Sequence, residues 1–160
     1  MTQPRIENSP ERKLVGKKLD MNFAYNRTME LWKSFMPHRN EIINRVNQDL
    51  ISMQVYPDNF SFTNFDIDLV FSKWALAEVS DFDNIPNGME SFTLAPGLYA
   101  VFEYKGLNTD PAIFRYLFGE WLPVSDYTLD SRPHFEVLGA KYKNNDPESE
   151  EEIWIPVKLK

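Results

Sequence analysis

The chain has 160 residues and a formal net charge of −7; 42% of the residues are hydrophobic, 14% are aromatic, and none is cysteine. The absence of cysteine excludes disulfides, thiolate nucleophiles and cysteine-based zinc sites, and the negative charge opposes contact with nucleic-acid backbones. No apolar run reaches the roughly 18 residues that span a bilayer, and the first five residues lack the layout of a signal peptide, so we expect a cytoplasmic protein without a membrane segment.

The first half of the chain predicts a strand, a helix and a short strand. Residues 1–9 are polar and are expected to form a loose lead-in, which places the domain at 10–160. A strand is predicted over 11–21, and apolar residues then keep a 3.6-residue phase from Met29 to Val46. Pro37 falls inside this phase and predicts a kink or a brief break. A short strand over 53–56 precedes residues 57–68, whose polar and aromatic alternation fits either a loop or an irregular extended segment.

The second half predicts the same kinds of element. A strand over 69–79 and a loop over 81–88 lead to a central strand over 98–104. Pro111 suits the first turn of a helix that Pro123 closes. A strand over 134–140, a charged turn over 143–152 and a strand over 153–157 follow, and Pro156 indicates an edge or a strand end.

One sequence pattern occurs twice. Residues 31–37 and residues 117–123 both read leucine, aromatic, two residues, aromatic, large apolar, proline, and the strand-like stretches before them lie at the same offset. Such self-similarity indicates one unit used twice, although aromatics at this spacing are also common by chance on buried helix faces. We predict an α+β fold in which two strand–helix–strand–strand half-units, about 10–80 and 90–160, are related by a pseudo-twofold axis. The antiparallel sheet would carry its helices on one face, with a ligand cleft between the units.

Four segments, over residues 97–102, 121–127, 132–136 and 152–157, resemble in order and spacing the GyrI-like small-molecule-binding domain. The resemblance covers residues 10–158. This effector-binding domain occurs at the C-terminus of AraC-type and MerR-type transcription regulators and as a free-standing protein. It implies a tandem repeat whose cleft binds hydrophobic, often cationic compounds, as in multidrug binding. By motif position it places the cleft-floor glutamate at Glu136. Trp154 departs from the family, which more often has tyrosine there.

Glu136 is the first candidate for a ligand-binding residue. It lies between Phe135 and Val137, so strand alternation places its side chain on the opposite face. A carboxylate in a cleft is partly desolvated, and it would pair with a cation or act as a general acid or base. The alternative is a solvent-facing glutamate on a half-buried strand.

Aromatic residues are the second group of candidates. Indole and phenol rings bind cations and stack on flat ligands, and the alternative for each residue is packing in the core. Phe35 and Trp121 occupy equivalent repeat positions and should share one role, and the Tyr127 hydroxyl could position a ligand or a water. The predicted cleft aromatics are Trp74, Tyr99, Trp121, Trp154, Phe35 and Tyr127.

No cofactor or metal is expected. His38 and His134 do not form a ligand set at helical or hairpin spacing, and no glycine-rich phosphate loop is present. The leading hypothesis is a stand-alone domain that senses or sequesters a hydrophobic, cationic small molecule. It would have no DNA-binding module of its own and would not bind DNA directly.

Two alternatives stay open. In one, the chain is a hydrolase in which Glu136 activates water to open a strained electrophilic ring. In the other, it is an interaction protein of the gyrase-inhibitor kind. A protein partner or a homodimer is compatible with each of these functions.

Overall fold

The computed structural model describes residues 3–64 and 66–160. Met1 and Thr2 of the predicted lead-in, and Phe65 in the predicted 57–68 segment, lie outside the described residues. The elements in chain order are β1 (Arg5–Ser9), β2 (Arg12–Met21), α1 (Thr28–Phe35), the 3-10 helix η1 (Met36–Glu41), β3 (Leu50–Val55), β4 (Phe71–Val79), β5 (Glu90–Leu94), β6 (Gly97–Lys105), α2 (Ala112–Tyr116), the π-helical turn η2 (Leu117–Trp121), α3 (Leu122–Val124), β7 (Tyr127–Leu129), β8 (His134–Leu138) and β9 (Glu150–Leu159). Within these residues, no helix is long and apolar enough to cross a membrane.

The sheet confirms the predicted duplication. Its strand order is β1-β6-β9-β8-β3-β4-β2-β5, with β7 added beside β9, and neighbouring strands pair antiparallel. Strands β3 and β8 lie at the centre. From them the order runs β4, β2 on one side and β9, β6 on the other. The unit strand–helix–strand–strand therefore occurs twice, as β2-α1-β3-β4 and β6-α2-β8-β9, about a pseudo-twofold axis between β3 and β8.

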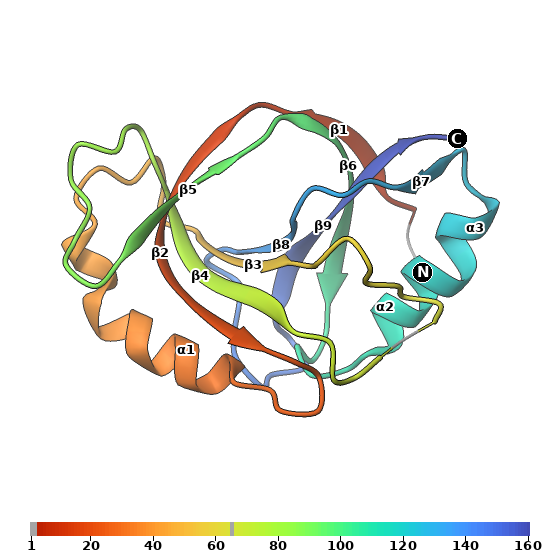
Figure 1. Ribbon diagram of the computed structural model, residues 1–160, viewed down its shortest axis with the longest axis horizontal. Coiled ribbons are helices and arrows are strands. Elements are labelled where there is room, and N and C mark those ends of the chain that lie inside the picture. The colour runs from red at the N-terminus through yellow and green to blue at the C-terminus, as the bar shows by residue number, and fades with distance from the viewer. Residues whose placement is uncertain (1–2, 65) are drawn as a thin grey trace.

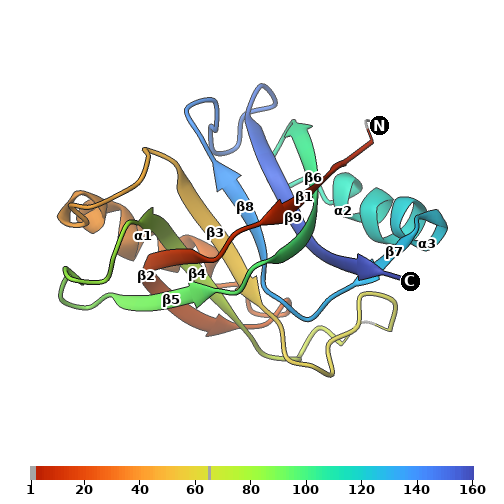
Figure 2. The ribbon, with the colours of Figure 1, turned by 90° about the horizontal axis from the view of Figure 1, so that it is seen from above.

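The two ends of the sheet meet. Strand β1 pairs with β6 and continues through Pro10 into β2, while β5 pairs with β2 and continues through Pro96 into β6. The strands that precede the two half-units are thus exchanged between them. Figure 1 shows the strands curving into a ring that β1 and β5 complete, and Figure 2 shows these two strands from above.

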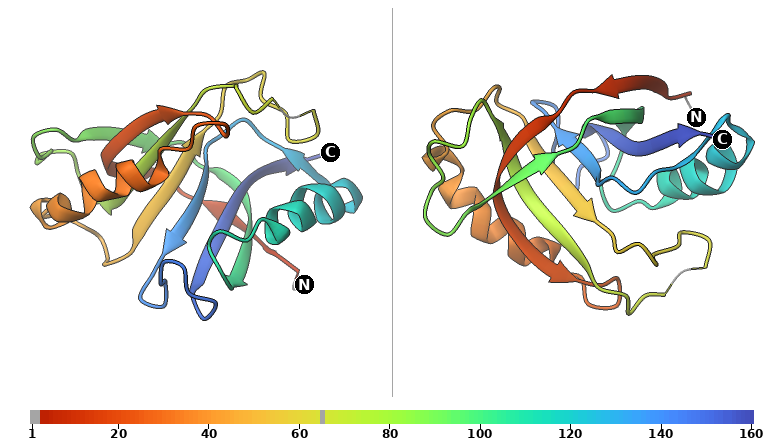
Figure 3. Two further views of the ribbon diagram at one scale, coloured as in Figure 1. Left: turned by 90° about the horizontal axis from the view of Figure 1, so that it is seen from below. Right: turned by 45° about the horizontal axis from the view of Figure 1, so that its top comes forward.

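Helices α1 and α2 lie outside this ring, one on either side of the central strands (Figure 3). Leu31 and Phe35 of α1 pack on the first half of the sheet, and Ile113 and Leu117 pack on the second half. The inner face of the ring holds a separate core of ten buried residues: Leu14, Ile51, Met53, Trp74, Leu76, Leu94, Tyr99, Val101, Phe135 and Trp154. Strand alternation separates these inner residues from those that meet the helices.

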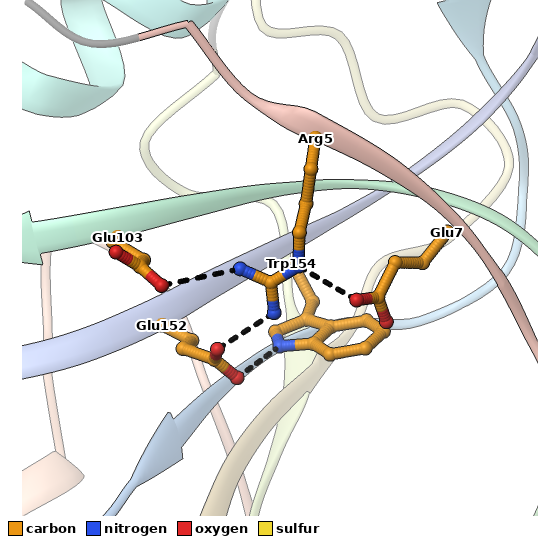
Figure 4. Close-up of polar contacts among 5 residues, drawn as sticks. All are labelled: Arg5, Glu7, Glu103, Glu152 and Trp154. Atoms are coloured by element: carbon orange, nitrogen blue, oxygen red, sulfur yellow. Dashed lines mark hydrogen bonds and ion pairs between the residues drawn. The ribbon is translucent and has the colours of Figure 1, made fainter.

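The prediction of a loose lead-in is wrong for Arg5–Ser9, which form β1. Figure 4 shows how this strand is held beyond its ladder with β6: Arg5 makes ion pairs with Glu7 at 2.6 Å, Glu152 at 2.7 Å and Glu103 at 3.4 Å. The second Glu152 carboxylate oxygen accepts a hydrogen bond from the Trp154 indole. A mostly polar segment is ordered here because β6 supplies its backbone partners, while β6 and β9 supply two of the three counter-charges of Arg5.

The predicted helical phase up to Val46 is also wrong beyond Glu41. Helix α1 tightens into η1 from Met36, one residue before Pro37, and Ile42 is already extended. Ile42 is buried beneath α1, but Ile43 is 73% exposed and Val46 is 49% exposed. The spacing of these residues matched a helix by coincidence, since an extended segment carries them.

Pro156 is not at a sheet edge or a strand end. It pairs with Tyr99 inside the long strand β9, and its carbonyl accepts a hydrogen bond from the Asp130 amide at 3.0 Å. On that side β9 pairs with β8 as far as Trp154 and with β7 from Val157 onward. The missing N–H therefore falls where β9 changes partners, so the proline costs no ladder hydrogen bond.

Candidate ligand-binding cavity

A cavity of about 780 Å³ lies on the outer face of the sheet, between the start of α1 and α2. Its floor is formed by Gln54 of β3, Lys73 of β4, Glu136 of β8 and Ile153 of β9, among other side chains. The register explains why they meet: Gln54 lies opposite Lys73, and Glu136 lies opposite Ile153. A volume in this range suits a drug-sized ligand.

An aromatic cluster bounds one end of the cavity. Phe62, in the segment between β3 and β4, stacks on Phe118 of η2 with ring centroids 4.2 Å apart and ring planes 7° apart. Tyr56 and His134 pack edge to face at 5.1 Å, and Phe62 also contacts both rings. The segment after β3 thus crosses from the first half-unit to the helix of the second. Its aromatic run was predicted, but its place in the site was not.

Phe118 and Gly119 line the cavity from a π-helical turn. Such turns are often found at functional sites, because the extra residue interrupts the regular helical phase. The sequence predicted an uninterrupted helix here. The π turn and the three-residue α3 follow α2 instead.

His134 takes part in this wall as a neutral ring. Burial lowers its pKa to about 3, so the imidazole is uncharged at neutral pH. Across residues 3–64 and 66–160, no group of three or more potential metal-binding side chains is present.

Glu136 lies on the cavity floor, on the face opposite Phe135. Its Oε2 accepts a hydrogen bond from the Gln54 side-chain amide at 3.2 Å. Burial raises the pKa of Glu136, and Lys73 and Gln54 act in the opposite direction. Glu151, on the adjacent strand β9, is half-buried. Its own burial and the negative charge of Glu136 raise the pKa of Glu151 to about 7. The floor thus holds a carboxyl group, that of Glu136, whose hold on its proton is strengthened by burial.

Three of the predicted cleft aromatics belong to the inner core. Tyr99 is fully buried and its hydroxyl donates to the Pro133 carbonyl at 2.9 Å, while Trp74 packs against Phe92 at 5.4 Å. Trp154 touches the cavity lining, but its ring stacks on Phe135 at 5.1 Å. The ladder pairs Trp154 with Phe135, so both point away from the face that carries Glu136.

The remaining aromatic candidates pack between helix and sheet. Phe35 is fully buried beneath α1, and Trp121 packs edge to face on Phe102 at 5.4 Å beneath η2. The two residues therefore share one structural role, as their repeat positions predicted, but neither lines the cavity. Tyr127 of β7 borders the Trp121 cluster and is likewise outside the lining.

Sequence reasoning missed Gln54, Lys73, Tyr56, Phe62 and Phe118. For Lys73 a signal existed, since this lysine lies within a largely apolar strand, directly before Trp74. Assigning it to the cavity face required the pairing of β3 with β4, which a single strand pattern does not contain.

Residues 2–158 match the family of the GyrI-like small molecule binding domain. Solved structures with the same fold include SAV2435 bound to tetraphenylphosphonium, with 18% identity, a TM-score of 0.63 and coverage of 98% of this chain and 94% of that one. The EcmrR C-terminal domain has 14% identity, a TM-score of 0.72 and coverage of 99% and 98%.

A hydrolase encoded by lin2189 from Listeria innocua has 12% identity, a TM-score of 0.62 and coverage of 98% and 92%. Among proteins with curated descriptions, none matches the chain. The match over nearly the whole length, together with the duplicated fold, shows that the chain belongs to the GyrI-like small-molecule-binding domain family.

Proposed function

We propose that this domain binds a hydrophobic, ring-bearing small molecule in the cavity on the outer face, and thereby senses or sequesters it. The observation that carries the proposal is an aromatic-walled cavity of about 780 Å³ with Glu136 on its floor. Predominantly apolar walls with few polar groups are typical of small-molecule sites.

The walls favour flat or aryl-bearing ligands. Phe114 and Phe118 present nearly parallel rings, 12° apart, along one side, and Tyr56 and Phe62 approach from the other half-unit. Each ring-to-ring contact with a ligand would add about 0.5–1.5 kcal/mol beyond the burial of apolar area. The Glu136 carboxyl would fix the orientation of a polar or charged ligand group.

A ligand in this position would contact both half-units at once. Gln54, Tyr56 and Phe62 come from the first, while Phe118 and Glu136 come from the second. Binding would favour one relative arrangement of the two halves, which is the requirement for sensing. Such a signal would pass to a separate partner or to a second copy of the chain.

The test is calorimetric titration of the protein with two aryl probes, tetraphenylphosphonium and triphenylphosphine oxide. We expect saturable binding of at least one of them. Phe62→Ala should weaken it about tenfold, because one stacked ring and its buried area are lost. Phe82→Ala is the matched control: this ring packs under α1, away from the cavity, and should leave affinity unchanged. No binding of either probe, or equal losses in both variants, would contradict the proposal.

One observation also supports the hydrolase alternative. Glu136, whose pKa is raised by burial, lines the same cavity as Tyr56. A carboxylate of this kind can take a proton from water as the water oxygen bonds to an electrophilic ring carbon and a ring C–C bond breaks. The electron pair of that bond passes to the activating group of the substrate, which accepts a hydrogen bond from the phenol and takes up a proton. Mass spectrometry after incubation with a cyclopropane-bearing electrophile would detect the hydrated product, and Glu136→Gln should abolish it. The interaction-protein alternative stays a prediction.

A further inference from the structure

Lys73 shares the cavity floor with Glu136. Cross-strand pairing places Lys73 beside Gln54, and Gln54 donates the hydrogen bond that Glu136 accepts. The lysine is half-buried, and burial lowers its pKa while Glu136 and Glu151 oppose that shift. Within residues 3–64 and 66–160, no hydrogen bond and no ion pair within 4.0 Å holds the Lys73 side-chain nitrogen, and the charges of Glu136 and Glu151 act on it from a longer distance. It is therefore a basic group that lines the cavity with its hydrogen-bond donors unused.

The charges that line the cavity do not sum to an electronegative site. Glu136 is the acidic residue of the described lining, whereas Lys73 and the exposed Arg115 are both basic. A ligand cation that approaches Glu136 also approaches Lys73, and like charges in a partly desolvated space repel strongly. Lys73 therefore opposes the attraction that the Glu136 carboxylate exerts on a ligand cation.

Lys73 and Glu136 together suit a ligand with a different polar group. An ammonium next to a carboxyl of raised pKa offers donors to a strong acceptor, such as an oxide, a carbonyl or one end of a zwitterion. Such a ligand would satisfy the unused donors of Lys73 without bringing net positive charge onto the floor.

We propose that Lys73 is a specificity-determining residue that directs the cavity to hydrophobic aryl molecules without net positive charge, and that its ammonium donates hydrogen bonds to an acceptor group of the ligand. This inference rests on the proposed function, since it specifies the ligand class of the same cavity.

The experiment compares the dissociation constants of triphenylphosphine oxide and tetraphenylphosphonium, which share three phenyl groups on phosphorus. The oxide is neutral and carries a strong acceptor; the phosphonium carries a fixed positive charge. The wild-type protein should bind the oxide at least about fivefold more tightly. In Lys73→Met the order should reverse: we expect phosphonium affinity to rise about tenfold and oxide affinity to fall.

Two variants serve as controls. Lys33→Met removes a positive charge from the exposed side of α1 and should leave the affinity ratio at its wild-type value. Lys73→Met combined with Glu136→Gln should lose the gained phosphonium affinity, because the carboxylate that attracts the cation is gone. If Lys73→Met does not fold, Lys73→Gln takes its place, since it removes the charge and keeps a hydrogen-bond donor on the floor. The comparison of the two probes on the wild-type protein needs no variant.

The outcomes separate the two proposals. A wild-type preference for the phosphonium, or an unchanged affinity ratio in a folded Lys73 variant, overturns the role of Lys73 and leaves the proposed function standing. Equal weakening of both probes in Lys73→Met shows a purely structural lysine and also overturns the inference. If neither probe binds, the proposed function fails and the inference falls with it.

Discussion

The two faces of the sheet hold aromatic side chains for different purposes. On the inner face Trp74, Tyr99 and Trp154 are at most 5% exposed, and they pack against one another or against neighbouring core residues. On the outer face Phe62 and Phe118 are half-buried and border a cavity that also holds charged groups. Aromatic content alone therefore does not locate a candidate site. The candidate site lies on the face where polar side chains are buried beside aromatic rings.

Removing an inner-face ring is expected to have the largest effect on stability. Trp154→Ala would lose stacking on Phe135 and the contact with the Arg12 guanidinium 5.0 Å away, and would leave a cavity in the core. We expect the free energy of unfolding to fall by about 3–5 kcal/mol in urea denaturation. Unchanged stability with a specific loss of probe binding would instead place Trp154 in the ligand site and break the distinction between the faces.

The free energy of unfolding should depend on pH because two half-buried side chains on the outer face, Glu151 and His134, have shifted pKa values. The folded-state pKa of Glu151 is raised from its ordinary 4.5 to about 7, so the stability that its protonation provides is complete below 4.5 and is lost as pH rises toward 7. His134 has the opposite effect on stability. Burial lowers its pKa from 6.5 to about 3, so the stability that the neutral ring provides is complete above pH 6.5 and is lost as the pH falls from 6.5 toward 3. Comparison of wild type with Glu151→Gln separates the two effects. We expect the variant to gain about 1–3 kcal/mol relative to wild type between pH 5 and pH 8.

The control for this pH profile is Glu120→Gln, at an exposed glutamate on η2 outside the cavity lining. It should follow the wild-type curve at every pH. A Glu151→Gln profile parallel to that of wild type would show that Glu151 titrates in the protein as it does in water.

The smallest effect on stability is expected for Arg5, in the edge strand β1. Arg5 makes three ion pairs, but its side chain is 40% exposed, and exposed pairs contribute little. Arg5→Met should therefore change the free energy of unfolding by no more than about 1 kcal/mol. A larger loss would mean that the ion-pair network, rather than the ladder with β6, holds β1 in place.

The repeat was predictable because its two copies carry the same apolar pattern, beginning at Leu31 and at Leu117, and helix-to-sheet packing imposes that pattern in both halves. Strand β1 was not predictable, since Ile6 is its only large apolar residue and its order comes from pairing with β6. Alternation placed Glu136 correctly opposite Phe135. The same rule could not place Trp154, because its face depends on the register that pairs it with Phe135. Sequence periodicity thus predicts which residues share a face of one strand, and only strand pairing shows which faces join.

The most direct test of the account is a crystal structure of the protein with triphenylphosphine oxide. We predict the probe on the outer face, with its phenyl groups against Phe62 and Phe118 and its oxygen within hydrogen-bond distance of the Lys73 ammonium. A probe bound inside the ring, against Trp74 and Tyr99, would contradict the account, because the inner face would then be the binding site and the outer cavity would not.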